Sequence, residues 1–455
     1  MTLRSINPVT GEVAGEYPQM TDDQVDAALA AGAVAYTDWR HVPLGERVAA
    51  LRRAAALLRD QSQALARLMA LEMGKPVSEG RGEVDKCAWV CEYYAENAAA
   101  FLADTPVDVD GGRARVVYRP LGLVLAVMPW NFPLWQFFRF FAPAVAAGNG
   151  ALLKHASNVT GCAHAIGDLV RGAGFPPDLL QVLAVPSTRV ERIIRDPRVV
   201  AVTLTGSTPA GRAVARTAGD VLKKTVLELG GSDPYVILED ADVMDAARIC
   251  ATSRMVNGGQ TCIAAKRMIV VDGAHDLFLD ALVSQMARWT SGDPLLSGTR
   301  LGPMARLDLR DELHEQVEAS VRAGARCVLG GEVPTGPGAF YPATVLADVG
   351  PGMPAYSEEL FGPVAAVIRA RDAADAVRIA NDTDFGLGAA VFTSDPERGL
   401  YIATEELDAG ACFVNDFVRS DPRLPFGGVK GSGYGRELGL WGIREFVNVK
   451  TVWIA

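Results

Sequence analysis

The sequence has few of the residues on which several common kinds of site depend. Only 5 of its 455 residues are histidine, and its 7 cysteines are loosely spaced and odd in number. Such cysteines do not suggest a disulfide framework. Cys87 and Cys91 would share a helical face, but no histidine is near them in sequence to complete a metal site. We therefore expect core thiols, no resident metal and a reducing, cytoplasmic setting.

Phosphate-binding motifs of the commonest kinds are also absent. No G-x-G-x-x-G follows a strand-like run, and Gly74-Lys75 precedes a proline where a P-loop needs Ser or Thr. The 44 Lys and Arg against 54 Asp and Glu give a net charge of −10, which argues against a nucleic-acid surface. The first residues contain no apolar run of the kind found in secretory signals, so we expect none.

One uncharged stretch, residues 121–138, approaches the length of a membrane-spanning helix. Pro129 and Pro133 would break such a helix, and Arg139 ends the run. The segment 121–128 is better interpreted as a buried parallel strand, followed by a loop and by a helix that begins after Pro133. We expect no contact with a membrane.

The rest of the chain predicts an α/β protein. Residues 22–72 have helical periodicity, and later apolar strand-like runs alternate with helical ones, which is typical of parallel sheets. The strand-like runs lie at residues 199–204, 235–238, 268–271 and 364–368. The length suggests about three domains. Two alternating segments, 113–119 and 444–454, have the character of edge strands, which pair either with a neighbouring subunit or within the chain.

Three local patterns are candidates for chemistry. Thr205-Gly206-Ser207 ends a strand and opens a helix whose free N–H groups would attract a phosphate; the alternative is a plain helix cap by Ser207 or Thr208. Glu228 stands among apolar neighbours just before Gly230-Gly231. It is either a general base whose pKa is raised by burial or an exposed residue at the end of a strand. Cys262 follows small, flexible residues, and we expect it at the start of a new element. It is either a nucleophile or a thiol of the core. His275, apparently in a surface turn, does not suggest a Cys/His pair.

Together with other motifs, these patterns closely resemble the aldehyde dehydrogenase superfamily over nearly the whole chain. The motifs, in order, are Pro129-Trp130-Asn131-Phe132-Pro133, Thr205-Gly206-Ser207, Glu228-Leu229-Gly230-Gly231, Gly259-Gln260-Thr261-Cys262, Glu358-Glu359-Leu360-Phe361-Gly362-Pro363 and residues 425–433. The resemblance implies a Rossmann-like cofactor domain, an α/β catalytic domain and a small β oligomerisation arm. It also implies that Cys262 is the nucleophile, that Asn131 helps to hold the oxyanion and that Glu228 activates water.

The resemblance further implies contacts with a nicotinamide dinucleotide. The matching cofactor positions are Trp130, Lys154, Gly206, Ser207, Leu229, Glu359 and Phe361. Many members have Lys-Pro-x-Glu where this chain has Lys154-His-Ala-Ser157. A glutamate there would repel a 2′-phosphate, whereas Ser157 can donate a hydrogen bond to it and Lys154 can pair with it. We therefore expect NADP to be favoured over NAD.

Within the superfamily, the chain looks most like the shorter bacterial succinate-semialdehyde dehydrogenases. Arg139 and Ser420 match positions that hold the substrate carboxylate there; alternatively, Arg139 pairs with a structural carboxylate. A second arginine of some members is replaced by Val256, with Arg254 as a possible substitute. The rival functions are a broad-specificity or medium-chain aldehyde dehydrogenase, a CoA-acylating relative and a structural lens or binding protein. The presence of both Cys262 and Glu228 disfavours the last two.

The motif order also suggests how the chain divides. We expect residues 1–101 and 121–229 to form the dinucleotide-binding domain and residues 230–435 the catalytic domain. Residues 102–120 and 436–455 would form the oligomerisation arm. The resemblance implies a homodimer or homotetramer.

Overall fold

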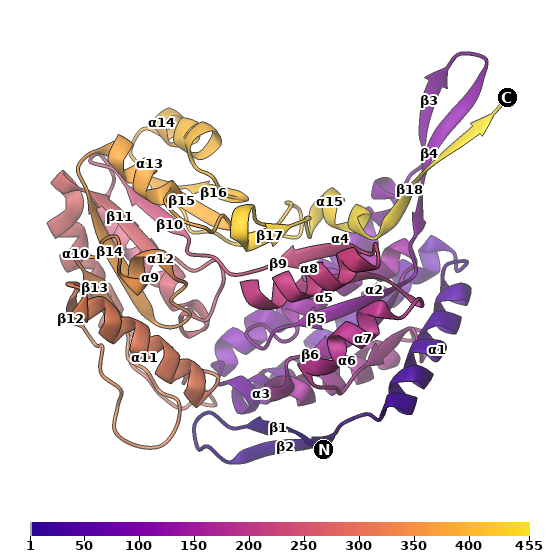
Figure 1. Ribbon diagram of the computed structural model, residues 1–455, viewed down its shortest axis with the longest axis horizontal. Coiled ribbons are helices and arrows are strands. Elements are labelled where there is room, and N and C mark those ends of the chain that lie inside the picture. The colour runs from indigo at the N-terminus through magenta and orange to yellow at the C-terminus, as the bar shows by residue number, and fades with distance from the viewer. Residues whose placement is uncertain (1) are drawn as a thin grey trace.

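The computed structural model describes residues 2–455, whose strands form four sheets. Two large sheets lie in two lobes, and a slender three-stranded arm projects from one of them (Figure 1). A short N-terminal hairpin of β1 (Thr2–Ile6) and β2 (Val13–Pro18) lies along the edge of the first lobe. The α/β class expected from the alternating pattern is confirmed.

The first lobe is built on a six-stranded sheet in the order β17-β9-β8-β5-β6-β7, parallel except for β17. Residues 121–128 contribute its buried central strand, and the next helix begins at Trp135, so the interpretation as strand, loop and helix is confirmed. No helix within residues 2–455 is long and apolar enough to cross a membrane. The strands are β5 (Leu123–Met128), β6 (Gly150–His155), β7 (Leu180–Val182), β8 (Val199–Thr205), β9 (Lys224–Glu228) and β17 (Gly433–Tyr434).

Helices cover this sheet, and the predicted helical region 22–72 is confirmed as three of them. Cys87 and Cys91 are both fully buried in the core, as their shared helical face predicted. The helices of this lobe are α1 (Asp22–Trp39), α2 (Leu44–Asp60), α3 (Ser62–Met73), α4 (Val77–Phe101), α5 (Trp135–Ala147), α6 (Thr160–Gly172), α7 (Val190–Arg195) and α8 (Thr208–Asp220).

The second lobe has a seven-stranded sheet in the order β12-β13-β14-β11-β10-β15-β16, parallel except for β12. The strands are β10 (Pro234–Ile237), β11 (Arg267–Val271), β12 (Arg326–Leu329), β13 (Thr344–Ala347), β14 (Val364–Ala370), β15 (Gly388–Phe392) and β16 (Ala411–Val414). The helices are α9 (Val243–Met255), α10 (Asp272–Met286), α11 (Leu307–Arg322), α12 (Pro354–Ser357), α13 (Ala373–Asn381) and α14 (Pro396–Tyr401). His275 is buried in α10, so its expected place in a surface turn was wrong.

The projecting arm consists of β3 (Thr105–Val109), β4 (Gly112–Pro120) and β18 (Val447–Ile454), all antiparallel. The two segments predicted as edge strands pair with each other, because β18 lies against β4. The pairing within the chain is therefore the correct alternative for these two segments. β4 is the central strand and not an edge, while β3 and β18 are the edges of this sheet.

The passage from the first lobe to the second lies between β9, which ends at Glu228, and β10, which begins at Pro234. The proposed domain cut at residue 230 falls in this link. Two features depart from the expected division near the C-terminus. β17 pairs with β9 of the first lobe although it precedes residue 436. Leu438, Ile443 and Phe446, in and beside α15 (Gly439–Glu445), belong to the core of the first lobe and not to the projecting arm.

Candidate active site

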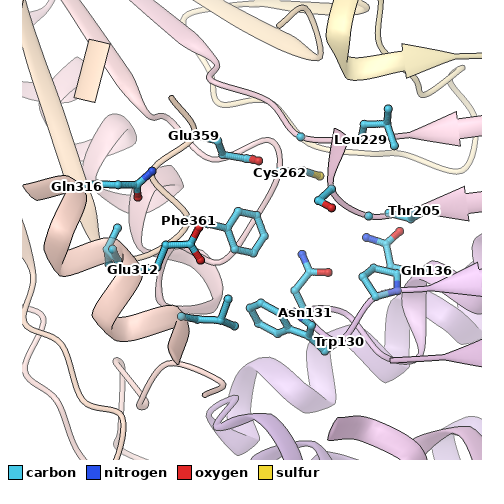
Figure 2. A pocket seen from close by; sticks show the side chains of 16 residues that line it. Trp130, Asn131, Gln136, Thr205, Leu229, Cys262, Glu312, Gln316, Glu359 and Phe361 are labelled. Carbon is cyan, nitrogen blue, oxygen red and sulfur yellow. The ribbon is translucent and has the colours of Figure 1, made fainter. Parts of the chain in front are cut away.

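Two cavities meet at Cys262. The first, of about 260 Å³, lies between the lobes, with Trp130, Asn131 and Thr205 on one side and Glu312, Glu359 and Phe361 on the other (Figure 2). The second, of about 310 Å³, is lined by α4, α5, the cysteine loop and residues 417–420. Cys262 and Gln136 line both cavities. A thiol at this junction can reach a reactant on one side and a second molecule on the other.

The loop before Cys262 depends on residues that tolerate left-handed backbone. Asn257, Gly258 and Gly259 have φ angles of 56°, 61° and 75° in the turn η3 (Val256–Gly259). Asparagine and glycine adopt this region at low cost. A Cβ at Gly259 would lie 2.1 Å from the carbonyl oxygen of Gly362, so glycine lets this loop approach the one that carries Glu359. Cys262 lies in the turn after η3, and not at the start of a new element as expected.

Lys266 links the backbone of Cys262 to the side chain of Glu359. Its buried ammonium donates to the carbonyl oxygens of Cys262, at 2.5 Å, and Thr261, at 3.0 Å, and pairs with Glu359 at 3.1 Å. The Cys262 side chain is partly exposed, yet desolvation raises the pKa of its thiol to about 12, and the charges of Lys266 and Arg139 only partly oppose this. At neutral pH Cys262 is therefore a thiol, and a reaction through its sulfur would require it to lose that proton.

Asn131 is held rigidly next to the cysteine loop. Its backbone carbonyl accepts from Lys75 Nζ at 2.9 Å and from Asn257 Nδ2 at 2.8 Å, while its own Nδ2 donates to the carbonyl of Gln260 at 3.0 Å. An amide nitrogen carries two hydrogens, so one remains available to a ligand in the cavity. The Cys262 backbone N–H donates no hydrogen bond to any described residue. The Asn131 amide, which the resemblance implied, and the Cys262 backbone N–H are thus both available as donors beside the first cavity.

Glu228 is the last residue of β9 and is 2% exposed, so the alternative of an exposed strand end was wrong. Burial and the neighbouring Glu437 carboxylate raise its pKa well above the usual range, against the charges of Arg139 and Arg436. Neither carboxylate oxygen has a hydrogen-bond partner among residues 2–455. Its side chain reaches beside Gly427 and is not among the residues that line the two cavities. The structure thus gives Glu228 the environment of a base without placing it against Cys262.

Most of the predicted cofactor residues line the first cavity. Five of them are Gly206, Ser207, Leu229, Glu359 and Phe361. Trp130 lines it as well, with its ring 5.7 Å from that of Phe361 at an angle of 87°. Ser207 occupies the N-cap position of α8, as the alternative expected, but no side chain among the described residues makes a capping hydrogen bond there. The N–H groups at this terminus stay available for a phosphate.

Lys154 and Ser157 lie apart from the walls of the two cavities. Lys154 stands near the carboxyl end of β6, is 6% exposed and belongs to no ion pair formed within residues 2–455. Burial lowers its pKa. Ser157 begins the short turn η1 (Ser157–Val159) just beyond that strand. A buried ammonium without an ion-pair partner among the described residues matches what an anionic ligand requires.

The polar end of the second cavity contains Arg139 and Ser420. Arg139 is buried, pairs with the buried Glu437 and donates to Thr205 Oγ1 at 3.2 Å. This pairing agrees with the alternative that Arg139 serves a structural carboxylate. Arg254 is fully buried, donates to the Gly259 carbonyl and does not line this cavity, so it is no substitute for the missing arginine.

The sequence reasoning missed three residues of the site. Gln136 lines both cavities, and Lys86 lines the second and donates to Ser420 Oγ at 2.7 Å. His155 Nε2 lies 2.8 Å from the Pro133 carbonyl, next to the Asn131 loop, and burial lowers its pKa to about 4, which keeps the ring neutral. Gln136 follows Asn131 by little more than one helical turn, which was a usable signal. Lys86 comes from a distant helix, and nothing in its local sequence marks it.

Comparison with known proteins agrees with this geometry. Residues 1–452 match the sequence model described as the aldehyde dehydrogenase family. The chain belongs to the aldehyde dehydrogenase family. It is 46% identical to a Synechocystis protein named "Probable succinate-semialdehyde dehydrogenase [NADP(+)]" over 455 residues, which are the whole of both chains. It is 49% identical to the Mycobacterium avium "Succinate-semialdehyde dehydrogenase [NADP(+)]" over 459 residues, covering 100% of this chain and 97% of that one.

The fold is equally close to solved members of the family. The succinic semialdehyde dehydrogenase of Streptococcus pyogenes, solved in complex with NADP+, superposes with a TM-score of 0.97 at 38% identity and 99% coverage of each chain. The expected fold, with a Rossmann-like cofactor lobe and an α/β second lobe, is confirmed.

Proposed function

We propose that this aldehyde dehydrogenase oxidises succinate semialdehyde to succinate, with NADP as the favoured acceptor and NAD as the second choice. The observation that carries the proposal is the meeting of two cavities at one cysteine. One cavity has the donors and aromatic walls of a dinucleotide site, and the other ends in hydroxyl and cationic side chains suited to a carboxylate. The printed names of the two relatives and of the solved neighbour support the same substrate and cofactor.

In the first step, the Cys262 sulfur adds to the aldehyde carbon, and its S–H proton passes to solvent water, which reaches the partly exposed side chain. The carbonyl oxygen gains negative charge as the tetrahedral thiohemiacetal forms. The free amide hydrogen of Asn131 and the backbone N–H of Cys262 are placed to hold that charge, which is where fixed donors lower the barrier most. The dinucleotide, when bound, takes up the hydride from this carbon, which leaves a thioester on the sulfur.

In the second step, water hydrolyses the thioester and releases the thiol and succinate. Glu228 acts as the base, because its unpartnered oxygens in a desolvated site bind a proton tightly. Its carboxylate has to turn away from Gly427 to reach water next to Cys262. Because the Glu228 side chain is buried, bulk water does not solvate its carboxylate. The carboxylate can therefore act only on a molecule that has entered the site.

The cofactor lobe suits the phosphorylated dinucleotide. Lys154 carries a buried, unpaired charge, and Ser157 offers a hydroxyl where many relatives have a repelling glutamate. The uncapped N-terminus of α8 beside Ser207 suits the pyrophosphate. These groups support NADP binding without excluding NAD.

A matrix of initial rates tests the proposal. Succinate semialdehyde, butanal and a medium-chain aldehyde are each assayed with NADP and with NAD, and the absorbance of the reduced dinucleotide is followed. We expect kcat/KM to be highest for succinate semialdehyde with NADP, by about tenfold or more over each alternative. A preference for uncharged aldehydes would indicate a broad-specificity enzyme, and a tenfold preference for NAD would contradict the cofactor assignment.

We also propose that the enzyme works in the cytoplasm as a homodimer or homotetramer. All seven cysteines are free, which suits a reducing compartment. The outward-facing side chains of β18 include apolar groups that a neighbouring subunit would cover.

A further inference from the structure

Several charged side chains line the second cavity, and most of them form ion pairs or hydrogen bonds with other groups of the protein. Arg139 pairs with Glu437, and Arg419 pairs with Asp416 at 2.6 Å while remaining half exposed. The charge of each arginine is therefore balanced by a carboxylate of the protein. A substrate anion would have to compete with those partners.

The acidic side chains of the cavity are engaged as well. Glu83 pairs with Lys75 and accepts from the backbone N–H groups of Leu134 and Trp135 at 2.8 and 2.9 Å. Glu79 accepts from the backbone N–H of Asn257 at 2.8 Å. These carboxylates hold the walls of the cavity together.

Lys86 is different. It extends from α4 into the cavity, and no ion pair formed within residues 2–455 includes it. Its Nζ donates to Ser420 Oγ at 2.7 Å and lies 4.4 Å from the centre of the Trp135 ring. An aromatic face and a neutral hydroxyl orient an ammonium group without cancelling its charge. Lys86 is thus a positioned cation whose charge is not balanced by a direct partner.

The direction of the hydrogen bond adds a second donor. An ammonium group can only donate, so Ser420 Oγ must be the acceptor, and the hydroxyl proton of Ser420 is free to point elsewhere. The remaining N–H groups of Lys86 are free in the same way. Two adjacent groups therefore present donors to one carboxylate, in the cavity that also contains the Cys262 thiol.

We propose that Lys86, together with the hydroxyl of Ser420, binds the far carboxylate of the aldehyde substrate and selects anionic over neutral aldehydes. Lys86 thereby takes the place of the second arginine that some family members have and that Val256 replaces here. Arg139 keeps its partner Glu437 and shapes the cavity beside them. The inference rests on the proposed function, because it assigns the group that recognises the substrate class.

The electrostatic setting of Lys86 supports this role. Burial first, and then the charge of Arg139, lower its pKa to about 8, while Asp421, Glu83 and the thiol of Cys87 raise it. The other titratable groups that line the same cavity are Glu79, Cys262 and Arg419. Lys86 is therefore mostly charged at neutral pH and loses its charge as the pH rises above about 8. A bound carboxylate favours the charged form.

Two substitutions and two substrates test the inference. Lys86→Met keeps the length of the side chain and removes the charge, and Lys86→Arg keeps the charge. With NADP as cofactor, we expect Lys86→Met to raise KM for succinate semialdehyde by about tenfold to a hundredfold, the usual worth of a charged hydrogen bond. Its kcat/KM for butanal should stay within about threefold of the wild type, which also shows that the variant folds. Lys86→Arg should recover most of the lost discrimination.

The matched control is Arg419→Met, which removes a cation from the same cavity that already has a partner. We expect it to change KM for succinate semialdehyde by less than about threefold. The inference is overturned if Lys86→Met leaves that KM unchanged, or if it impairs both substrates equally. A wild-type enzyme without preference for succinate semialdehyde would overturn the proposed function itself, whereas a preference that survives Lys86→Met overturns only the role of Lys86.

A pH profile gives an independent readout. The ratio of kcat/KM for succinate semialdehyde to that for butanal cancels the titration of groups that both reactions share. In the wild type this ratio should fall above about pH 8, as Lys86 loses its proton. In Lys86→Arg it should stay level over the same range, because arginine keeps its charge. The same fall in both proteins would overturn the inference.

Discussion

At the residue scale, burial favours the neutral forms of the two groups that we propose react. The thiol of Cys262 and the carboxyl of Glu228 both have raised pKa values, because desolvation disfavours their charged forms more than nearby cations favour them. A neutral carboxyl cannot remove a proton from water. Under the proposed mechanism, Glu228 therefore becomes a more effective base as the pH rises.

The raised pKa of Glu228 predicts the pH dependence of thioester hydrolysis. The carboxylate is the active form, so a higher pKa means that hydrolysis is lost as the pH falls through that value and gained as the pH rises. Measured across the neutral range, steady-state turnover should rise with pH if hydrolysis limits it. The first formation of reduced dinucleotide also gains with pH, because the Cys262 thiol has to lose its proton, so the two phases have to be measured separately. Stopped-flow absorbance measures both phases. A turnover rate that is independent of pH over this range would show that Glu228 is not the limiting base.

The choice between NADP and NAD is a second feature that we expect to depend on a single residue, Ser157. Replacing Ser157 with Glu should reduce kcat/KM for NADP by about tenfold or more relative to NAD, because a carboxylate repels the 2′-phosphate and accepts from the ribose hydroxyls. The check is the ratio of the two kcat/KM values with succinate semialdehyde. Ser207→Ala serves as the control, since a pyrophosphate contact is common to both cofactors. An unchanged ratio in Ser157→Glu would remove the basis of the NADP assignment.

Much of the site could be predicted from short motifs, since they specify local backbone and side-chain type. Trp130, Asn131, Gly206, Ser207, Glu359 and Phe361 all line the cavity that contains Cys262. Lys86 could not be found in this way, because its role depends on the packing of α4 against residues 417–420, which are distant in sequence. The partner of Arg139 could not be predicted for the same reason, because Glu437 lies far later in the sequence.

At the scale of elements, one buried carboxylate joins three segments of the first lobe. Glu72, near the end of α3, accepts from the backbone N–H groups of Gly161 and Cys162, each at 2.9 Å, at the start of α6. It also accepts from Ser5 Oγ of β1 (Thr2–Ile6) at 2.5 Å and from the Tyr17 hydroxyl of β2 (Val13–Pro18) at 3.3 Å. A carboxylate at a helix N-terminus is stabilised by the free N–H groups and the helix dipole.

Loss of this carboxylate should destabilise the lobe. We expect Glu72→Ala to lower the free energy of unfolding by about 2–4 kcal/mol, because it leaves buried donors without partners and opens a cavity. Denaturant titration followed by fluorescence measures the change. Ser5→Ala, which removes only one of the donors, is the control and should cost about 1 kcal/mol. Equal stability of Glu72→Ala and the wild type would show that the hairpin and α6 do not depend on this contact.

Element type was predictable where the hydrophobic pattern was long, as in the helical region 22–72 and in the buried strand within residues 121–128. Strand partners were not. The sequence of residues 113–119 has the alternation of an edge strand, yet β4 is the centre of its sheet, with Arg113, Arg115 and Arg119 on one face. Solvent reaches both faces because the arm projects from the lobe (Figure 1). The alternation could not distinguish an edge strand from a projecting sheet.

At the scale of the whole molecule, net charge and local charge act in opposite directions. The net charge of −10 repels an anionic aldehyde and an anionic cofactor at long range. Under the proposed function, binding therefore depends on local cations, and Lys86 in the second cavity and the buried Lys154 have no ion-pair partner among the described residues. Screening by salt shortens the range of the repulsion. Those cations explain how an acidic protein can bind two anions in adjacent sites.

The arm supplies the prediction for the assembly. Val449 and Trp453 of β18 lie four residues apart on one face and are 60% and 51% exposed. If a neighbouring subunit covers this strand, Val449→Glu with Trp453→Glu should release single chains, because two charges would be buried at the contact. Light scattering after size-exclusion chromatography measures the mass. Lys450→Glu, on the opposite face, is the control. An unchanged mass in the double variant would exclude this face of the arm as the contact.

The central claim is that Cys262 forms a succinyl thioester that Glu228 then helps to hydrolyse. The most direct measurement is mass spectrometry of the Glu228→Gln variant after mixing with succinate semialdehyde and NADP. The account predicts one equivalent of reduced dinucleotide per site, followed by very slow turnover, and a mass increase of one succinyl group on the peptide that contains Cys262. Full loss of the first equivalent of reduced dinucleotide, or a variant that turns over normally without an acyl group on Cys262, would contradict it.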